Sequence, residues 1–68
     1  MKNKTIMHGM YIMRIRGNDT SNIYITNNKT KEKTVLTLSD NVIKQSNHLN
    51  LPANLTMKAV SLLYAMKD

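Results

Sequence analysis

The sequence contains no cysteine, only two glycines and only four acidic residues, and each shortage excludes a class of site. Without cysteine the chain forms no disulfide and offers no thiolate ligand to a metal. Because Gly9 and Gly17 stand alone, there is no glycine-rich loop of the kind that binds nucleotide phosphates. The acidic residues are scattered and form no closely spaced carboxylate pair for acid–base catalysis: Asp19, Glu32, Asp40 and Asp68.

Long hydrophobic runs are missing as well. The apolar residues near the N-terminus are interrupted by His8, Gly9 and Arg14, which makes the stretch too short for a membrane span or a signal peptide. We therefore expect a cytoplasmic protein without a membrane partner. His8 and His48 are far apart in sequence, and two isolated histidines do not make a four-ligand metal site. We expect no enzyme activity, no cofactor, no metal and no small-molecule substrate.

The 68 residues predict one small domain, with residues 1–4 flexible. A domain of this size buries only about 60% of its unfolded surface, so binding to a partner or to a second copy is a plausible source of stability. Ten basic residues against four acidic ones leave a net charge of +6, which suits a polyanion or an acidic protein surface. The abundance of Asn, Lys, Ile and Thr is typical of A+T-rich codons and indicates an A+T-rich bacterium, or a phage or mobile element living in one.

Residues 50–67 are the one long segment whose pattern predicts a helix, with Pro52 near its start. Apolar residues recur at helical spacing along one face, namely Leu55, Ala59, Leu62, Leu63 and Met66. A second apolar stripe follows on roughly the opposite side and consists of Met57, Val60 and Tyr64. Either a small domain covers its helix on both sides, or this outer stripe faces another protein or a second copy. The sequence leaves both interpretations open.

Three upstream segments have the composition of β-strands. Residues 5–16 are rich in β-branched and aromatic side chains, with a bulge or bend expected at Gly9. Within this segment Tyr11, Met13 and Ile15 share one face, and the alternate residues share the other. Residues 23–26 and 32–38 follow after polar turns, so an antiparallel meander is the economical topology.

Residues 39–47 predict a short helix before the long one. Ser39 stands at the N-cap position, Asp40 is an acid in the first turn, and Leu38 and Ile43 have the spacing of a hydrophobic staple. The predicted fold is therefore α+β with the order β-β-β-α-α, in which a three-stranded antiparallel meander is followed by two helices packed on one face.

Two functions are consistent with this sequence. The first is a non-enzymatic protein-interaction module, such as a phage or mobile-element regulator, that binds a host protein or self-associates through the outer stripe Met57, Val60 and Tyr64. The alternative is a nucleic-acid-binding regulator that uses a basic β-hairpin, with the contacts supplied by Arg14, Arg16, Lys29, Lys31 and Lys33. We rank the protein-interaction hypothesis marginally first.

Each feature of the nucleic-acid hypothesis also has a structural explanation. Lysines at a sheet edge keep that edge soluble, and we favour this role for the lysines of the hairpin. Tyr11 and Tyr24 on neighbouring strands have the chemistry to stack on bases, but a core position is the favoured interpretation for both.

Overall fold

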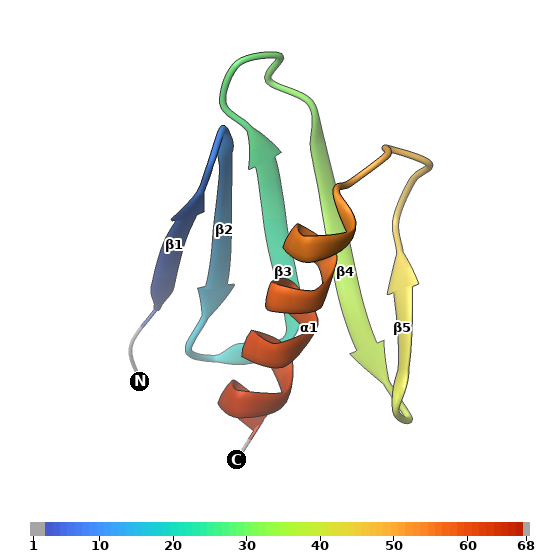
Figure 1. The fold of residues 1–68 in the computed structure, drawn as a ribbon. Coiled ribbons are helices and arrows are strands. Elements are labelled where there is room, and N and C mark those ends of the chain that lie inside the picture. Colours follow the sequence, from blue (N-terminus) through green and yellow to red (C-terminus); the bar gives the residue numbers. More distant parts are fainter. Residues whose placement is uncertain (1–2, 68) are drawn as a thin grey trace.

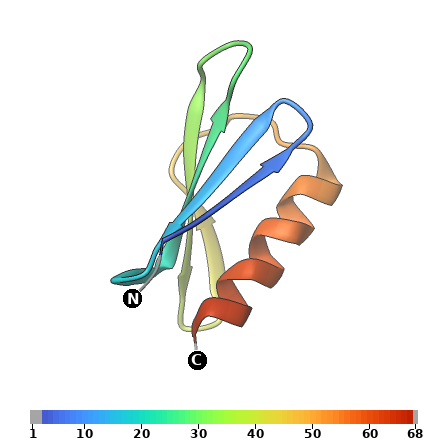
Figure 2. The same cartoon turned by 90° about the vertical axis from the view of Figure 1, so that its left-hand side faces the viewer.

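The computed structural model describes residues 3–67 and folds them into one antiparallel sheet with a single helix against it (Figure 1). The elements in chain order are β1 (Lys4–His8), β2 (Tyr11–Arg16), β3 (Asp19–Asn27), β4 (Lys33–Ser39), β5 (Val42–Gln45) and α1 (Ala53–Lys67). Each strand pairs with the next one along the chain, so the sheet is a five-stranded meander. Figure 2 shows α1 lying against one face of the sheet, and we call the opposite face the open face.

The predicted order β-β-β-α-α is wrong, since the described residues form five strands and one helix. Part of the error lies in residues 5–16, which are two strands joined by a two-residue turn. Gly9 has a φ of 61°, a conformation that glycine adopts without steric cost, and His8 pairs with Tyr11 directly across the turn. A glycine at the first position of a two-residue turn is typical of β-hairpins. The bend at Gly9 therefore reverses the chain.

The short helix predicted over residues 39–47 is also absent, because these residues form the hairpin between β4 and β5. Asp40 and Asn41 have φ values of 52° and 64°, so both central residues of the turn are left-handed. This is the geometry of a type I′ turn, which Asp and Asn tolerate better than other non-glycine residues. It is incompatible with the first turn of a helix. Val42 and Ile43 are β-branched and continue as a strand, with Ile43 opposite Leu38.

The hydrophobic core lies between the sheet and α1. Its buried side chains come from the central strands and from one side of the helix: Met13, Ile15, Ile23, Ile25, Leu36, Leu38, Leu55, Ala59 and Leu63. The predicted inward face of the helix is confirmed, with Leu62 and Met66 packed at its margin. Leu36 and Leu38 lie on the same face of β4 and are both buried in this core. Full burial of each Leu or Ile contributes about 1.5–3 kcal/mol, so this layer holds the helix on the sheet.

Polar side chains fasten the segment that leads from β5 to α1. The Gln45 side-chain amide donates to the carbonyl of Leu49 at 2.7 Å, and that of Asn47 donates to the carbonyl of Lys33 at 2.8 Å. The Ser46 hydroxyl oxygen accepts from the backbone N–H of Val35 at 3.0 Å. These bonds carry the chain from the edge of the sheet back over its core, where α1 begins.

The flexible segment expected over residues 1–4 falls partly on Met1 and Lys2, which lie outside the described residues. Asn3 is described, and its side-chain oxygen accepts a hydrogen bond from the backbone N–H of Gly17 at 3.0 Å. Lys4 is the first residue of β1.

The turn geometry predicts an unusual order of stability at position 41. Because Asn41 is left-handed, Asn41→Gly should be at least as stable as the parent, while Asn41→Ala should be less stable by about 1 kcal/mol. In a helix the order would be reversed, since glycine is about 1 kcal/mol worse than alanine there. Urea unfolding followed by circular dichroism measures the difference. An alanine variant more stable than the glycine variant would contradict the hairpin.

Candidate functional site

The open face of the sheet displays cations around one aromatic ring. Strand alternation directs the core residues toward α1 and their neighbours away from it. Tyr24 on β3 lies opposite Arg14 on β2 and opposite Val35 on β4. One step along the strands, Thr26 lies opposite Lys33. Arg14 and Lys33 are exposed, whereas Tyr24 and Thr26 are half-buried between their neighbours.

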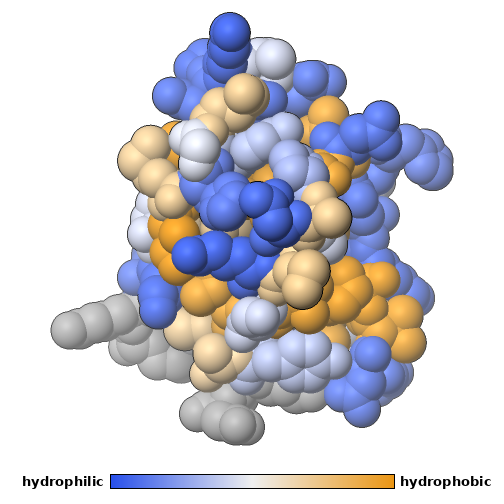
Figure 3. Space-filling model, in the orientation of Figure 1, coloured by the Kyte–Doolittle hydropathy of each residue, from blue (hydrophilic) through white to orange (hydrophobic). Residues whose placement is uncertain are grey.

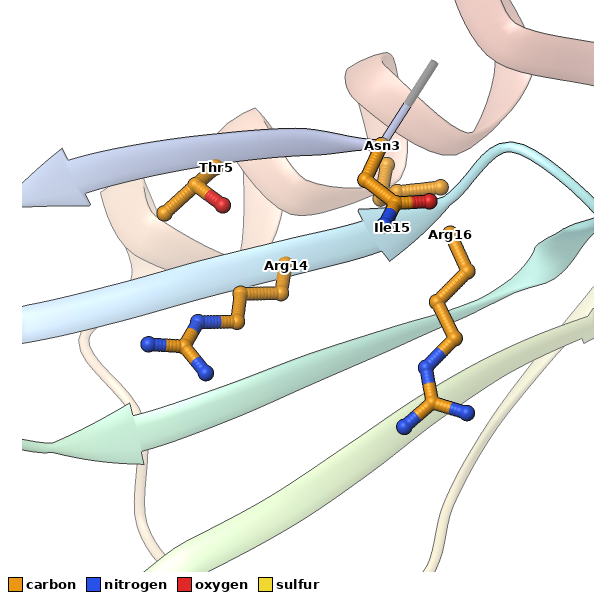
Figure 4. A pocket seen from close by; sticks show the side chains of 5 residues that line it. All are labelled: Asn3, Thr5, Arg14, Ile15 and Arg16. Atoms are coloured by element: carbon orange, nitrogen blue, oxygen red, sulfur yellow. The ribbon is translucent and has the colours of Figure 1, made fainter. Parts of the chain in front are cut away.

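Two hollows flank the arginines on this face. One has a volume of about 230 Å³ and is lined by Arg14, Arg16, Tyr24, Thr26 and Lys33. The other has a volume of about 330 Å³ and is lined by Asn3, Thr5, Arg14, Ile15 and Arg16. Figure 4 shows that Arg14 and Arg16 leave β2 on the same side and extend their guanidinium groups over the neighbouring strands. Both groups therefore present their N–H donors to a ligand on the open face.

Arg16 contacts the tyrosine directly. The Cζ atom of its guanidinium lies 5.3 Å from the centroid of the Tyr24 ring. A cation within about 6 Å of an aromatic face is attracted by the negative potential of the ring. In the unbound protein, Arg16 thus lies over the ring face of Tyr24.

The positive charge of the open face extends to β5, and the Asp19 carboxylate lies at the margin of this face beside Arg16. Lys44 on β5 lies opposite Thr37, which places it on the open face as well. Asp19 pairs with Arg16 in the register of β2 and β3. Its two carboxylate oxygens accept hydrogen bonds from the Asn22 side chain at 3.1 and 2.9 Å, and the Asn22 side-chain oxygen accepts one from the hydroxyl of Thr37.

The lysines predicted for a basic hairpin are divided between two places. Lys33 belongs to the open face, while Lys29 and Lys31 lie in the loop between β3 and β4, at one end of the sheet. The expected solubilising role at a sheet edge stays a prediction, since β4 lies between β3 and β5 but its pairing with β5 begins only at Leu36, three residues beyond Lys33. The structure thus brings Arg14, Arg16 and Lys33 together around one hollow and leaves the other two lysines at the rim.

Asn27 organises the loop that carries Lys29 and Lys31. This asparagine is buried, and its side-chain oxygen accepts from the backbone N–H groups of Lys29 and Thr30 at 2.9 and 3.1 Å. Its own backbone N–H donates to the carbonyl of Glu32 at 2.8 Å, and its carbonyl accepts from the N–H of Lys31. The buried side chain of Asn27 therefore satisfies two N–H groups of the turn, and its main chain pairs with Lys31 and Glu32.

The predicted outer stripe of α1 is only partly exposed to solvent. The side chains of Met57 and Tyr64 are 71% and 44% exposed, whereas Val60 is half-buried. Figure 3, which views the molecule from the helix side, shows hydrophobic and hydrophilic residues interspersed over this face. Two of the three stripe residues are therefore exposed to solvent.

The site residues predicted from the sequence do not include two residues of the open face, Tyr24 and Lys44. The core position favoured for Tyr11 is correct in that its side chain packs against the core. The same interpretation is wrong for Tyr24, which lines the hollow on the open face. The alternation of Ile23, Tyr24 and Ile25 contains that signal, because two buried isoleucines turn the residue between them outward. Lys44 was not assigned to the sheet because residues 39–47 were predicted to form a helix.

Other kinds of site find little support within residues 3–67. No three His, Asp or Glu side chains of this range lie close enough together to hold a metal ion. His8 is half-buried on β1, and His48 is exposed in the segment before α1. The helix of this range is not long and apolar enough to cross a membrane.

Comparison of the chain with protein-family models, with curated proteins and with solved structures finds no match. The arguments about function therefore start from the geometry of the open face.

The role of Asn27 is testable by stability. Asn27→Ala removes the acceptor for two backbone N–H groups of the turn, and these two hydrogen bonds, at a net of about 0.5–1.5 kcal/mol each, together contribute about 1–3 kcal/mol. We expect a loss of stability in that range by urea unfolding. Asn28→Ala is the matched control, because the exposed Asn28 side chain has only a long contact of 3.4 Å with the Lys31 ammonium group. Equal losses in the two variants would show that Asn27 does not organise the loop.

Proposed function

We propose that this protein is a small non-enzymatic nucleic-acid-binding regulator and that its open sheet face contacts the phosphate backbone. The observation that supports the proposal is the convergence of Arg14, Arg16 and Lys33 on one hollow of the uncovered face. The proposal includes a cytoplasmic location, where such a ligand is available.

The chemistry of the face suits phosphate. Arginine presents a planar set of N–H donors that matches two phosphate oxygens at once, and lysine supplies a mobile point charge. Binding of cations to a nucleic acid also releases the counterions condensed on it, which is a large part of the affinity. A net charge of +6 adds long-range attraction to the same ligand.

The proposal reverses the order of the two hypotheses drawn from the sequence. Protein interaction was ranked first because α1 has a second apolar stripe. In the folded chain Val60 of that stripe is half-buried, so only Met57 and Tyr64 of the three stripe residues are exposed. The cations, in contrast, are gathered on one face by the pairing of β2, β3 and β4.

Neutralising the open face should weaken binding and flatten its dependence on salt. We expect the triple variant Arg14→Gln, Arg16→Gln, Lys33→Gln to lower the slope of log affinity against log salt by about 2, given about 0.7 per phosphate contact on a single strand. Fluorescence anisotropy with labelled oligonucleotides at several salt concentrations measures both quantities.

Lys58→Gln, compared with Arg14→Gln, serves as the matched control. Both changes remove one exposed positive charge, but Lys58 lies on α1, on the other side of the molecule. Arg14→Gln should lower affinity more than Lys58→Gln does. If the two variants lose affinity equally, net charge and not the open face governs binding, and the proposed site is wrong.

Self-association through α1 is a second candidate, favoured by the exposure of Met57 at 71% and Tyr64 at 44%. Two copies of the stripe Met57, Val60 and Tyr64 would face each other across a twofold axis. The partner on this stripe would be a second copy of the chain, because a domain of this size gains most from covering its own exposed apolar side chains.

The dimer is tested by sedimentation across a range of protein concentrations. The parent protein should show a mass that rises toward twice the monomer value, and Met57→Asp with Tyr64→Ser should remain monomeric with an unchanged circular dichroism spectrum. A parent protein that stays monomeric at every concentration would eliminate this candidate.

A further inference from the structure

Among the described residues, Tyr24 is the only tyrosine on the open face, and it lies at the centre of that face. Tyr24 belongs to β3, the middle strand of the five, with Arg14 on the strand to one side and Lys33 on the strand to the other. Arg14 lies directly across from Tyr24, whereas the residue directly across on β4 is Val35 and Lys33 is the diagonal neighbour, at about 7–8 Å between the backbones. An aromatic ring flanked by cations in this way provides a surface for one base and contacts for the phosphates on either side of it.

The position of the ring distinguishes between nucleic acids. In a duplex the bases are stacked inside, so a flat sheet contacts mainly the phosphates. An aromatic ring makes no favourable contact with phosphates. A single strand can turn one base outward onto a tyrosine, and its phosphates remain free to contact neighbouring cations. The combination of Tyr24 with Arg14 and Lys33 therefore fits a single strand better than a duplex.

Arg16 occupies the place that a base would take. Its guanidinium lies over the ring of Tyr24 at 5.3 Å from the centroid, and the side chain is exposed. A gap of this size does not admit a base between the two groups, so a stacked base must displace the guanidinium. The long side chain of Arg16 permits that movement, and its charge then becomes available to a phosphate.

We propose that the open face binds single-stranded nucleic acid, with one base stacked on Tyr24 in place of the Arg16 guanidinium and with the adjacent phosphates held by Arg14 and Lys33. This inference rests on the proposed function and adds the class of nucleic acid and the contact that selects it.

A tryptophan at position 24 reports the stacking directly. The chain contains no tryptophan, so Tyr24→Trp introduces a single fluorophore of the same flat shape. Tyr64→Trp is the matched control, because Tyr64 lies on α1 and away from the open face. Three ligands are titrated at low salt: an oligonucleotide of about eight nucleotides, its duplex and linear polyphosphate, which has the charge but no bases.

We expect the single strand to quench the tryptophan fluorescence of the Tyr24→Trp variant by contact with a base, while polyphosphate and duplex leave it nearly unchanged. The fluorescence of the Tyr64→Trp variant should respond to none of the three ligands. If polyphosphate or the duplex quenches the Tyr24→Trp variant as strongly as the single strand does, the inference is overturned.

Affinities of two further variants complete the test. Tyr24→Phe retains the ring and should bind the single strand as the parent does. Tyr24→Thr preserves a strand-forming residue but removes the ring, and it should lower single-strand affinity about 5- to 150-fold without changing polyphosphate affinity. A loss that is the same for both ligands would overturn the stacking contact.

The two proposals fail in different ways. If Tyr24→Thr binds the single strand as well as the parent while the triple charge variant does not, the stacking inference is wrong and the proposed function stands. If the parent protein binds no nucleic acid at physiological salt, the proposed function is wrong and the stacking inference is lost with it.

Discussion

The packing of Leu55, Ala59 and Leu63 against the sheet is the interaction on which the rest of the structure depends. These three side chains are fully buried and leave the helix on one side. A helix of 15 residues is about 22 Å long and about 10 Å wide, so α1 covers one face of the sheet and nothing more. The opposite face therefore meets the solvent, and the residues proposed to bind nucleic acid stand on that face.

Solvent exposure explains the polar residues of the open face, which also carries Met7, Ile12 and Val35, but it does not explain why the charge of this face is positive. Threonines such as Thr26 and Thr37 satisfy the need for polar strand residues, and either sign of charge would serve equally well. The register of the sheet nevertheless places Arg14 beside Tyr24 and Lys33 one step beyond it, with Lys44 on the adjacent strand. Solubility does not explain why positive charge is concentrated around an aromatic ring. Binding of a phosphate-bearing ligand would explain it.

The fold was predictable where a pattern extended over many residues. The C-terminal helix was predicted correctly, although it begins at Ala53 and not at residue 50, and the shared inward face of Tyr11, Met13 and Ile15 was correct as well, because periodic burial leaves a periodic sequence. The turns were harder, since two residues decide each of them. Ser39 and Asp40 match a helix start, yet Asp40 and Asn41 together also match a type I′ turn, and the local sequence does not choose between them. Tertiary structure selects the turn, because the free edge of β4 offers backbone hydrogen-bond partners to Val42 through Gln45.

The sequence by itself determined a small basic chain, an amphipathic C-terminal helix and the side of each strand on which Arg14, Arg16 and Lys33 would lie. Only the tertiary structure decided that these cations share one hollow with Tyr24. The physical reason is that strand alternation is a local property of the backbone, whereas the neighbours of a side chain depend on which strands pair and in which register. Residues 14, 24 and 33 become neighbours only when the hairpins between them close.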